Sequence, residues 1–159
     1  MLVVYYFFTS LRVDSMSPIN FLESILHQIL TPEMLSPSLQ QEIEAIFPGL
    51  SDPREPDTDK LQSLVFRQWG GHAGKQIFLI VDGLDELSAD TQKVIFRILM
   101  NLYQNHPKTL KFLTAAQPEV DLGSPFCNAS TITTIYIQGH DTQADVDIYL
   151  ETKGDHFFL

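Results

Sequence analysis

The sequence of 159 residues has little cysteine and few basic residues, and both scarcities limit what the chain can be. Its single cysteine, Cys127, excludes an internal disulfide framework and any cysteine-rich zinc site, so a reducing compartment is expected. Ten basic residues against 20 acidic residues give a formal net charge of −10. No basic stretch offers neutralisation of phosphates, and a nucleic-acid partner is therefore not expected.

Long hydrophobic runs and internal repeats are also missing from the sequence. The apolar stretch 1–8 lacks a basic leader and is too short for a signal core or a membrane span, so we expect a strand there and no membrane-spanning segment. The composition, 44% hydrophobic and 19% charged, is that of a globular protein. The length suits one domain over 1–159 with a sizeable core.

No phosphate-binding loop of the Gly-x-x-x-x-Gly-Lys-Ser/Thr type occurs in the sequence. The glycine-rich stretch 70–76 differs from it because Gly70 and Gly74 are one position too close and Gln76 replaces the hydroxyl residue that binds magnesium. The stretch also lies between an expected helix and an expected strand, whereas phosphate binds the backbone amides at the start of a helix. We therefore predict a connecting turn here.

The most informative segment that is present is the stretch 77–86, which reads IFLIVDGLDE. Its five consecutive large apolar residues predict a strand of a parallel sheet, buried on both faces. Ligands of open α/β sheets bind beyond the carboxyl ends of the strands, so Asp82, Asp85 and Glu86 are expected where a ligand would lie. The same residues also fit a plain turn, because Asp and Gly suit turns and Glu86 then precedes the next helix.

The rest of the sequence alternates between strand and helix patterns. Apolar and β-branched runs predict strands at about 2–8, 77–82, 110–114 and 131–137. Apolar residues at helical spacing, with capping residues and prolines at the ends, predict helices at about 18–30, 36–47, 59–69, 89–105 and 141–150. This alternation predicts an α/β fold, a three-layer sandwich with a mostly parallel sheet. Trp69 is expected in the core and not as a platform for a ligand.

The order of these features resembles the NACHT and nephrocystin-like N-terminal NTPase domains of fungal STAND proteins, which are relatives of NLR immune receptors. Segment 3–8 is similar to the strand that follows the family's first helix, and segment 17–30 to the next helix. Segment 78–87 resembles the Walker B signature with its extra acidic pair. Segment 110–121 is similar to the sensor strand, which normally leads into Thr-Ser-Arg-Pro-Glu, and 135–150 resembles the end of the NTPase core.

This resemblance implies a sheet of P-loop NTPase (ASCE) type and a site for Mg²⁺ with ATP or GTP. In such a site Asp82 binds Mg²⁺, and Asp85 or Glu86 positions the attacking water. Gln117 occupies the position of the usual sensor arginine, and its neutral amide binds a phosphate oxygen more weakly than a cation does. The family's first strand and phosphate loop precede the strand that starts here at Leu2, and both are missing from the sequence.

We therefore expect a single incomplete NACHT-type NTPase domain over 1–159, truncated before the Walker B half, with vestigial catalytic residues and no hydrolysis by itself. Whether any cofactor binds is left open, and the expected location is the cytoplasm. One alternative is an interaction or adaptor module that keeps the α/β scaffold and pairs with itself or a full-length STAND paralogue. Another alternative is a metal-dependent phosphohydrolase built on Asp82, Asp85 and Glu86. It is the weaker one, because haloacid-dehalogenase-like phosphatases use Asp-x-Asp, whereas this sequence has Asp-x-x-Asp.

Overall fold

The computed structural model describes residues 1–47, 57–72 and 74–117. The chain divides into two units, Met1–Asp121 and Leu122–Leu159, and the described residues all belong to the first. The strand expected at 131–137 and the helix expected at 141–150 lie outside the described residues. The expectation of one domain over the whole chain stays a prediction.

Strands and helices follow one another in the order that the apolar pattern predicts. The strands of the described part are β1 (Leu2–Phe7), β2 (Ile77–Asp82) and β3 (Leu110–Thr114). Its α-helices are α1 (Pro18–Ile29), α2 (Pro37–Ile46), α3 (Thr58–Gly70) and α4 (Ala89–Asn105). Short 3₁₀ turns occupy η1 (Val13–Met16), η2 (Pro32–Met34) and η3 (Leu84–Glu86). The predicted elements of this part of the chain are thus confirmed.

Each α-helix begins at a polar side chain that caps its first turn. The side chains of the four caps accept hydrogen bonds from backbone N–H groups two or three residues further on; the caps are Ser17, Ser36, Asp57 and Ser88. A proline follows the cap directly in α1 and α2. The N–H groups of the first turn have no partner within the helix, so these caps explain why the helices start where they do.

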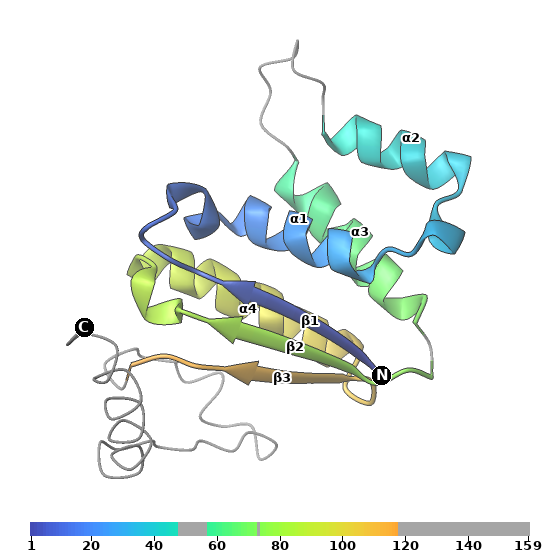
Figure 1. Cartoon of the computed structure of the whole chain (residues 1–159). Coiled ribbons are helices and arrows are strands. Elements are labelled where there is room, and N and C mark those ends of the chain that lie inside the picture. The colour runs from blue at the N-terminus through green and yellow to red at the C-terminus, as the bar shows by residue number, and fades with distance from the viewer. Residues whose placement is uncertain (48–56, 73, 118–159) are drawn as a thin grey trace, which may run out of the picture. The chain divides into compact units, whose positions relative to one another are not determined.

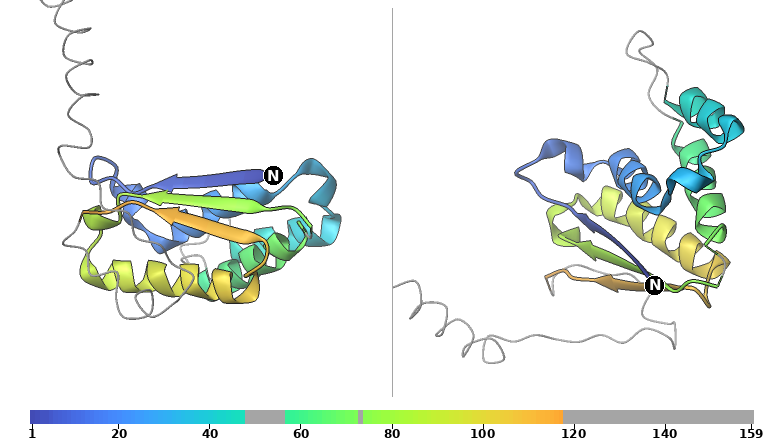
Figure 2. Two further views of the ribbon diagram at one scale, coloured as in Figure 1. Left: turned by 90° about the horizontal axis from the view of Figure 1, so that it is seen from below. Right: turned by 45° about the vertical axis from the view of Figure 1, so that its right-hand side comes forward.

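The sheet is parallel, and its strands lie in chain order, β1-β2-β3. Leu2 pairs with Ile77, and Ile77 pairs in turn with Leu110. Adjacent parallel strands are joined by crossover connections, which are nearly always right-handed. Both connections here move one strand in the same direction across the sheet, so their helices are expected on the same face. Accordingly α1, α3 and α4 lie on one face of the sheet (Figures 1 and 2). The described residues thus form an α/β structure with two of the three expected layers.

The two faces of the sheet differ in burial, which corrects the expectation that the strand at 77–82 is buried on both faces. On the helix side, Val4 and Leu79 are fully buried. On the opposite face, Tyr5 is 55% exposed, Phe7 54% and Leu113 63% within the described part of the chain. The apolar run of β2 did not reveal this difference, because a continuous run fits a strand with either one or two covered faces.

The outer edge of β1 is covered by a side chain of α1. The Gln28 Oε1 atom accepts a hydrogen bond from the Tyr5 N–H at 3.0 Å, and Gln28 Nε2 donates to the Tyr5 carbonyl at 2.8 Å. An exposed strand edge presents unpaired N–H and C=O groups that favour association with other chains. The Gln28 amide therefore makes the two bonds that a neighbouring strand would make at Tyr5.

Candidate functional site at the carboxyl edge of the sheet

The acidic residues predicted from the sequence lie at the edge of the sheet where its parallel strands end. Asp82 is the last residue of the middle strand, and its side chain is exposed. The Phe8 N–H donates to the Asp82 carbonyl at 3.0 Å, and the Ala115 N–H donates to the Val81 carbonyl at 3.1 Å. The three strand ends are thus held together, and the segments that leave β1 and β3 flank Asp82.

A tight turn follows Asp82 and requires glycine at the next position. The Asp82 Oδ1 atom accepts a hydrogen bond from the Gly83 N–H at 2.8 Å. Gly83 has φ +74°, and a Cβ atom there would lie 2.2 Å from the Phe8 carbonyl oxygen. Side chains tolerate neither this backbone conformation nor this approach well. The Asp-Gly pair therefore has a structural role in bringing the ends of β1 and β2 together.

Glu86 connects two loops that are distant in the sequence. Its Oε2 atom accepts a hydrogen bond from the Ser10 N–H at 2.8 Å. Interactions with the Ser10 side chain, and next with its backbone N–H, lower the pKa of Glu86 because they favour the ionised carboxylate. This carboxylate therefore holds the loop after β1 against η3, whereas the neighbouring Asp85 is half-buried.

The first turn of α4 fixes the acidic turn from the other side. The Gln92 Nε2 atom donates to the Leu84 carbonyl at 2.9 Å and to the Leu87 carbonyl at 3.1 Å. Leu84 itself is fully buried and anchors η3 in the core. The position of Asp85 and Glu86 is consequently determined by packing and by hydrogen bonds to the backbone.

The carboxylates at this edge do not form a metal site by themselves. No group of three or more His, Cys, Asp or Glu side chains is placed to hold a metal ion among residues 1–47, 57–72 and 74–117. Mg²⁺ is usually bound through one or two carboxylates, several waters and the phosphates of a substrate. Asp82 alone therefore fits Mg²⁺ only where phosphate oxygens supply further ligands.

The glycine-rich stretch lies at the opposite, amino edge of the sheet. Helix α3 ends at Gly70 and β2 begins at Ile77, so the stretch connects a helix to a strand, as predicted. Among its described residues, 70–72 and 74–76, no helix starts that would direct backbone amides at a phosphate.

The sequence model of the family described as nephrocystin 3, N-terminal, matches residues 1–117. The chain belongs to this family. The match confirms the predicted nephrocystin-like N-terminal domain and takes in every described strand and helix, with Gln117 as its last residue. Comparisons with curated proteins and with solved structures gave no match. None of the helices described for this family member is both long and apolar enough to cross a membrane.

In this nephrocystin 3 N-terminal domain, Gln117 is exposed and lies three residues beyond the end of β3. The Ala115 N–H still bonds to β2, so the segment that carries Gln117 leaves the sheet beside Asp82. The structure thereby brings Asp82, Asp85, Glu86 and the Gln117 segment to one edge of the sheet.

Sequence reasoning missed two residues that organise this edge of the sheet, Ser10 and Gln92. Ser10 lies 76 positions from Glu86 and donates to it through its backbone N–H group, and the Ser10 side chain also interacts with the Glu86 carboxylate. Gln92 occupies an ordinary helix position, and its partners are backbone carbonyl groups. No residue type or spacing in the sequence indicates such contacts, because they depend on how the loops fold back.

Proposed function

We propose that this chain is a degenerate nucleotide-binding domain of NACHT type from a STAND signalling protein, in which the Walker B strand and the sensor strand are retained. The observation that carries the proposal is the place of Asp82. It ends the middle strand of a parallel sheet, at the edge where ligands of open α/β sheets bind, with the Gln117 segment beside it. P-loop NTPases hold magnesium through an acidic residue in this position.

The residues of the site have different parts in this proposal. Asp82 supplies one carboxylate oxygen to Mg²⁺ when the phosphates of ATP or GTP are present. Asp85 is the better candidate for positioning water, since the Glu86 carboxylate already accepts a bond from Ser10. Gln117 offers the γ-phosphate a neutral hydrogen bond only.

We expect the 159 residues to hydrolyse no nucleotide by themselves. Phosphoryl transfer depends on positioning and on charge stabilisation, to which a phosphate loop and its lysine contribute strongly. No segment of this sequence has the loop pattern, and the described edge offers one suitably placed carboxylate. The same geometry makes the phosphohydrolase alternative unattractive, because three acidic side chains do not converge on one ion in the described residues.

A fusion protein tests this proposal. The strand, phosphate loop and helix of an intact relative are fused ahead of Met1, and thermal melting is measured with ATP or GTP, with and without Mg²⁺. We expect a rise in the melting temperature that needs both Mg²⁺ and Asp82. A ligand at 100 times its dissociation constant adds about 2.7 kcal/mol to the free energy of unfolding. Asp82→Ala should abolish the rise, and Asp90→Ala, which removes an exposed carboxylate on α4, should retain it.

The chain without the fusion is the second arm of the experiment. We expect a cooperative melt that does not respond to nucleotide. A response that requires Mg²⁺ and Asp82 would show that the chain holds a phosphate cradle of its own, and the description as degenerate would then be wrong. If neither protein responds while the chain binds a full-length relative in gel filtration, the interaction module is the better description.

A further inference from the structure

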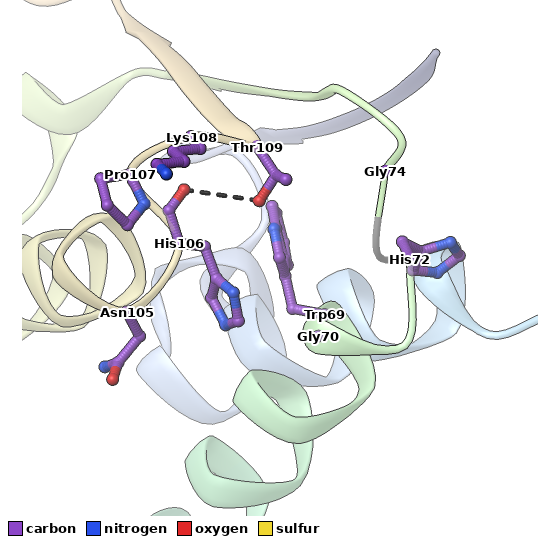
Figure 3. A pocket seen from close by; sticks show the side chains of 9 residues that line it. All are labelled: Trp69, Gly70, His72, Gly74, Asn105, His106, Pro107, Lys108 and Thr109. Atoms are coloured by element: carbon purple, nitrogen blue, oxygen red, sulfur yellow. Dashed lines mark hydrogen bonds between the residues drawn. The ribbon is translucent and has the colours of Figure 1, made fainter.

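A cavity of about 390 Å³ lies where α3 and α4 end, and its polar groups are bonded within the chain (Figure 3). His106 Nε2 lies 3.2 Å from the Phe66 carbonyl, and His72 Nε2 lies 2.7 Å from the Ile29 carbonyl. The Thr109 hydroxyl donates to the His106 carbonyl at 3.5 Å. These bonds hold the helix ends to each other and to the turns, so the cavity belongs to the packing of the helices. The exposed face of the sheet is a separate surface.

Most exposed apolar side chains of the described residues gather on one face of the sheet. Helices α1, α3 and α4 cover the opposite face (Figures 1 and 2). Five of the eight large apolar side chains that are exposed in residues 1–47, 57–72 and 74–117 lie on the uncovered face, and the alternation of β2 adds a half-buried isoleucine. We call this surface the open face, and it consists of Val3, Tyr5, Phe7, Phe78, Ile80 and Leu113.

The open face is large enough to form a small interface. An aromatic side chain can bury about 150–250 Å², so six apolar side chains, three of them aromatic and most about half exposed, leave roughly 500 Å² accessible. Apolar patches of about 300–600 Å² are often functional. Two open faces placed against each other would bury about 1,000 Å² in total, which is the lower limit for a specific interface. The area therefore fits a weak dimer.

The side chains along the open face are arranged so that it fits a second copy turned end to end. Val3, Phe78 and Lys111 are in register at the amino end of the strands, and Phe7 and Asp82 at the carboxyl end. When two such sheets stack about 10 Å apart with antiparallel strands, the small Val3 of each copy meets the large Phe7 of the other. The exposed Lys111 of each copy then lies beside the exposed Asp82 carboxylate of the other. Parallel stacking would instead place the two Asp82 carboxylates against each other, which is unfavourable.

We propose that the open face is an interface between two copies of this chain, which stack as a two-fold dimer with antiparallel strands. The middle row of the face, Tyr5, Ile80 and Leu113, then packs against the same row of the other copy. From the area we expect a dissociation constant of roughly 10–100 µM. A second copy suits the face better than a nucleic acid or an anionic membrane, because the net charge of −10 repels both.

Sedimentation velocity of the whole chain without nucleotide tests the dimer independently of the nucleotide-binding proposal. The mass should rise from one chain to two over concentrations that span about tenfold on either side of the expected dissociation constant. Leu113→Gln should weaken association by at least about tenfold, because each dimer loses two buried leucines. Leu35→Gln is the matched control, since Leu35 is an exposed leucine that lies between η2 and α2 and outside the sheet. It should leave the association unchanged.

Charge reversal tests the antiparallel alignment of the two copies. Lys111→Glu places a second carboxylate beside Asp82 of the other copy and should weaken association about tenfold, because two ion pairs become repulsive. The double variant Lys111→Glu/Asp82→Lys exchanges the two charges and should restore association to within about threefold. Lys93→Glu makes the same reversal at an exposed position on α4 and should have no effect, which controls for the change in net charge.

Three results would overturn the proposal. A chain that stays monomeric over the whole concentration range would mean that residues 118–159 or another partner cover the open face. Equal effects of Leu113→Gln and Leu35→Gln would mean that association is unspecific. A double variant that associates no better than Lys111→Glu would show that the copies do not stack with antiparallel strands. Lys111 is exposed, so this variant remains informative even if Leu113→Gln fails to fold.

Discussion

The backbone at Gly83 lies against the carbonyl oxygen of Phe8, and a single substitution can test how much this close approach matters for stability. Gly83→Ala adds a Cβ atom 2.2 Å from that oxygen in a residue with φ +74°. We expect the free energy of unfolding to fall by about 2–4 kcal/mol, as measured by urea denaturation.

Gly74 offers a matched control for this substitution. It has a similar φ of +84°, but an added Cβ atom would meet nothing within 4 Å. Gly74→Ala should therefore cost only about 1 kcal/mol, the strain of the left-handed conformation offset by the reduced freedom of the unfolded chain. Equal losses in the two variants would show that the contact with Phe8 contributes nothing.

Glu86 makes the stability of the domain depend on pH. The hydrogen bonds from Ser10 lower its pKa in the folded state below the ordinary value of 4.5. The contribution of Glu86 is therefore present above the unfolded pKa and is lost as the pH falls through the folded pKa. Glu86→Gln should lower the melting temperature at pH 7, and this difference should shrink as the pH falls through the folded pKa of Glu86.

The exposed Glu44 of α2 is the comparison residue for this measurement. Glu44→Gln should leave the pH profile of the melting temperature parallel to that of the unaltered chain. A Glu86→Gln protein whose melting temperature differs equally at pH 7 and pH 3 would contradict the assignment of the titration to Glu86.

Among the elements, β1 depends on α1 for its outer edge. Gln28→Ala removes the two bonds to Tyr5 and exposes that edge to other chains. We expect a loss of about 0.5–1.5 kcal/mol in the free energy of unfolding, together with more light scattering on concentration.

Gln41→Ala on the exposed side of α2 is the control, because it makes the same change of residue type in another helix. Scattering that rises equally in both variants would mean that Gln28 has no special protective effect on the edge of β1.

The sequence predicts the individual elements well because their signals are local. Apolar runs mark the strands, and Ser17, Ser36 and Ser88 mark three helix starts by capping the residues that directly follow. The Gln28 bonds to Tyr5 had no such signal, since they join positions 23 apart and need α1 to be packed beside β1.

For the whole molecule, the sequence predicts the α/β class and the place of Asp82 at a strand end, and both are confirmed. It does not predict the exposure of Tyr5 and Phe7, because burial depends on which face the crossovers take and not on the strand's own residues. The candidate site is likewise predicted in part from local sequence and decided in part by tertiary structure. Asp82, Asp85 and Glu86 follow from a motif, whereas the bond from Ser10 that occupies Glu86 depends on tertiary structure.

The pairing of β1 with β2 also determines when the sheet can form during synthesis. Leu2 pairs with Ile77, 75 positions further along the chain, so β1 leaves the ribosome long before its partner. At about 5–20 residues per second the delay is roughly 4–15 s, far longer than a helix needs to form. During this interval only α1 and the neighbouring segments can cover the apolar side chains of the nascent strand. The pairing of β1 must therefore wait for the emergence of β2, and chaperones that bind short apolar segments can act on β1 before it.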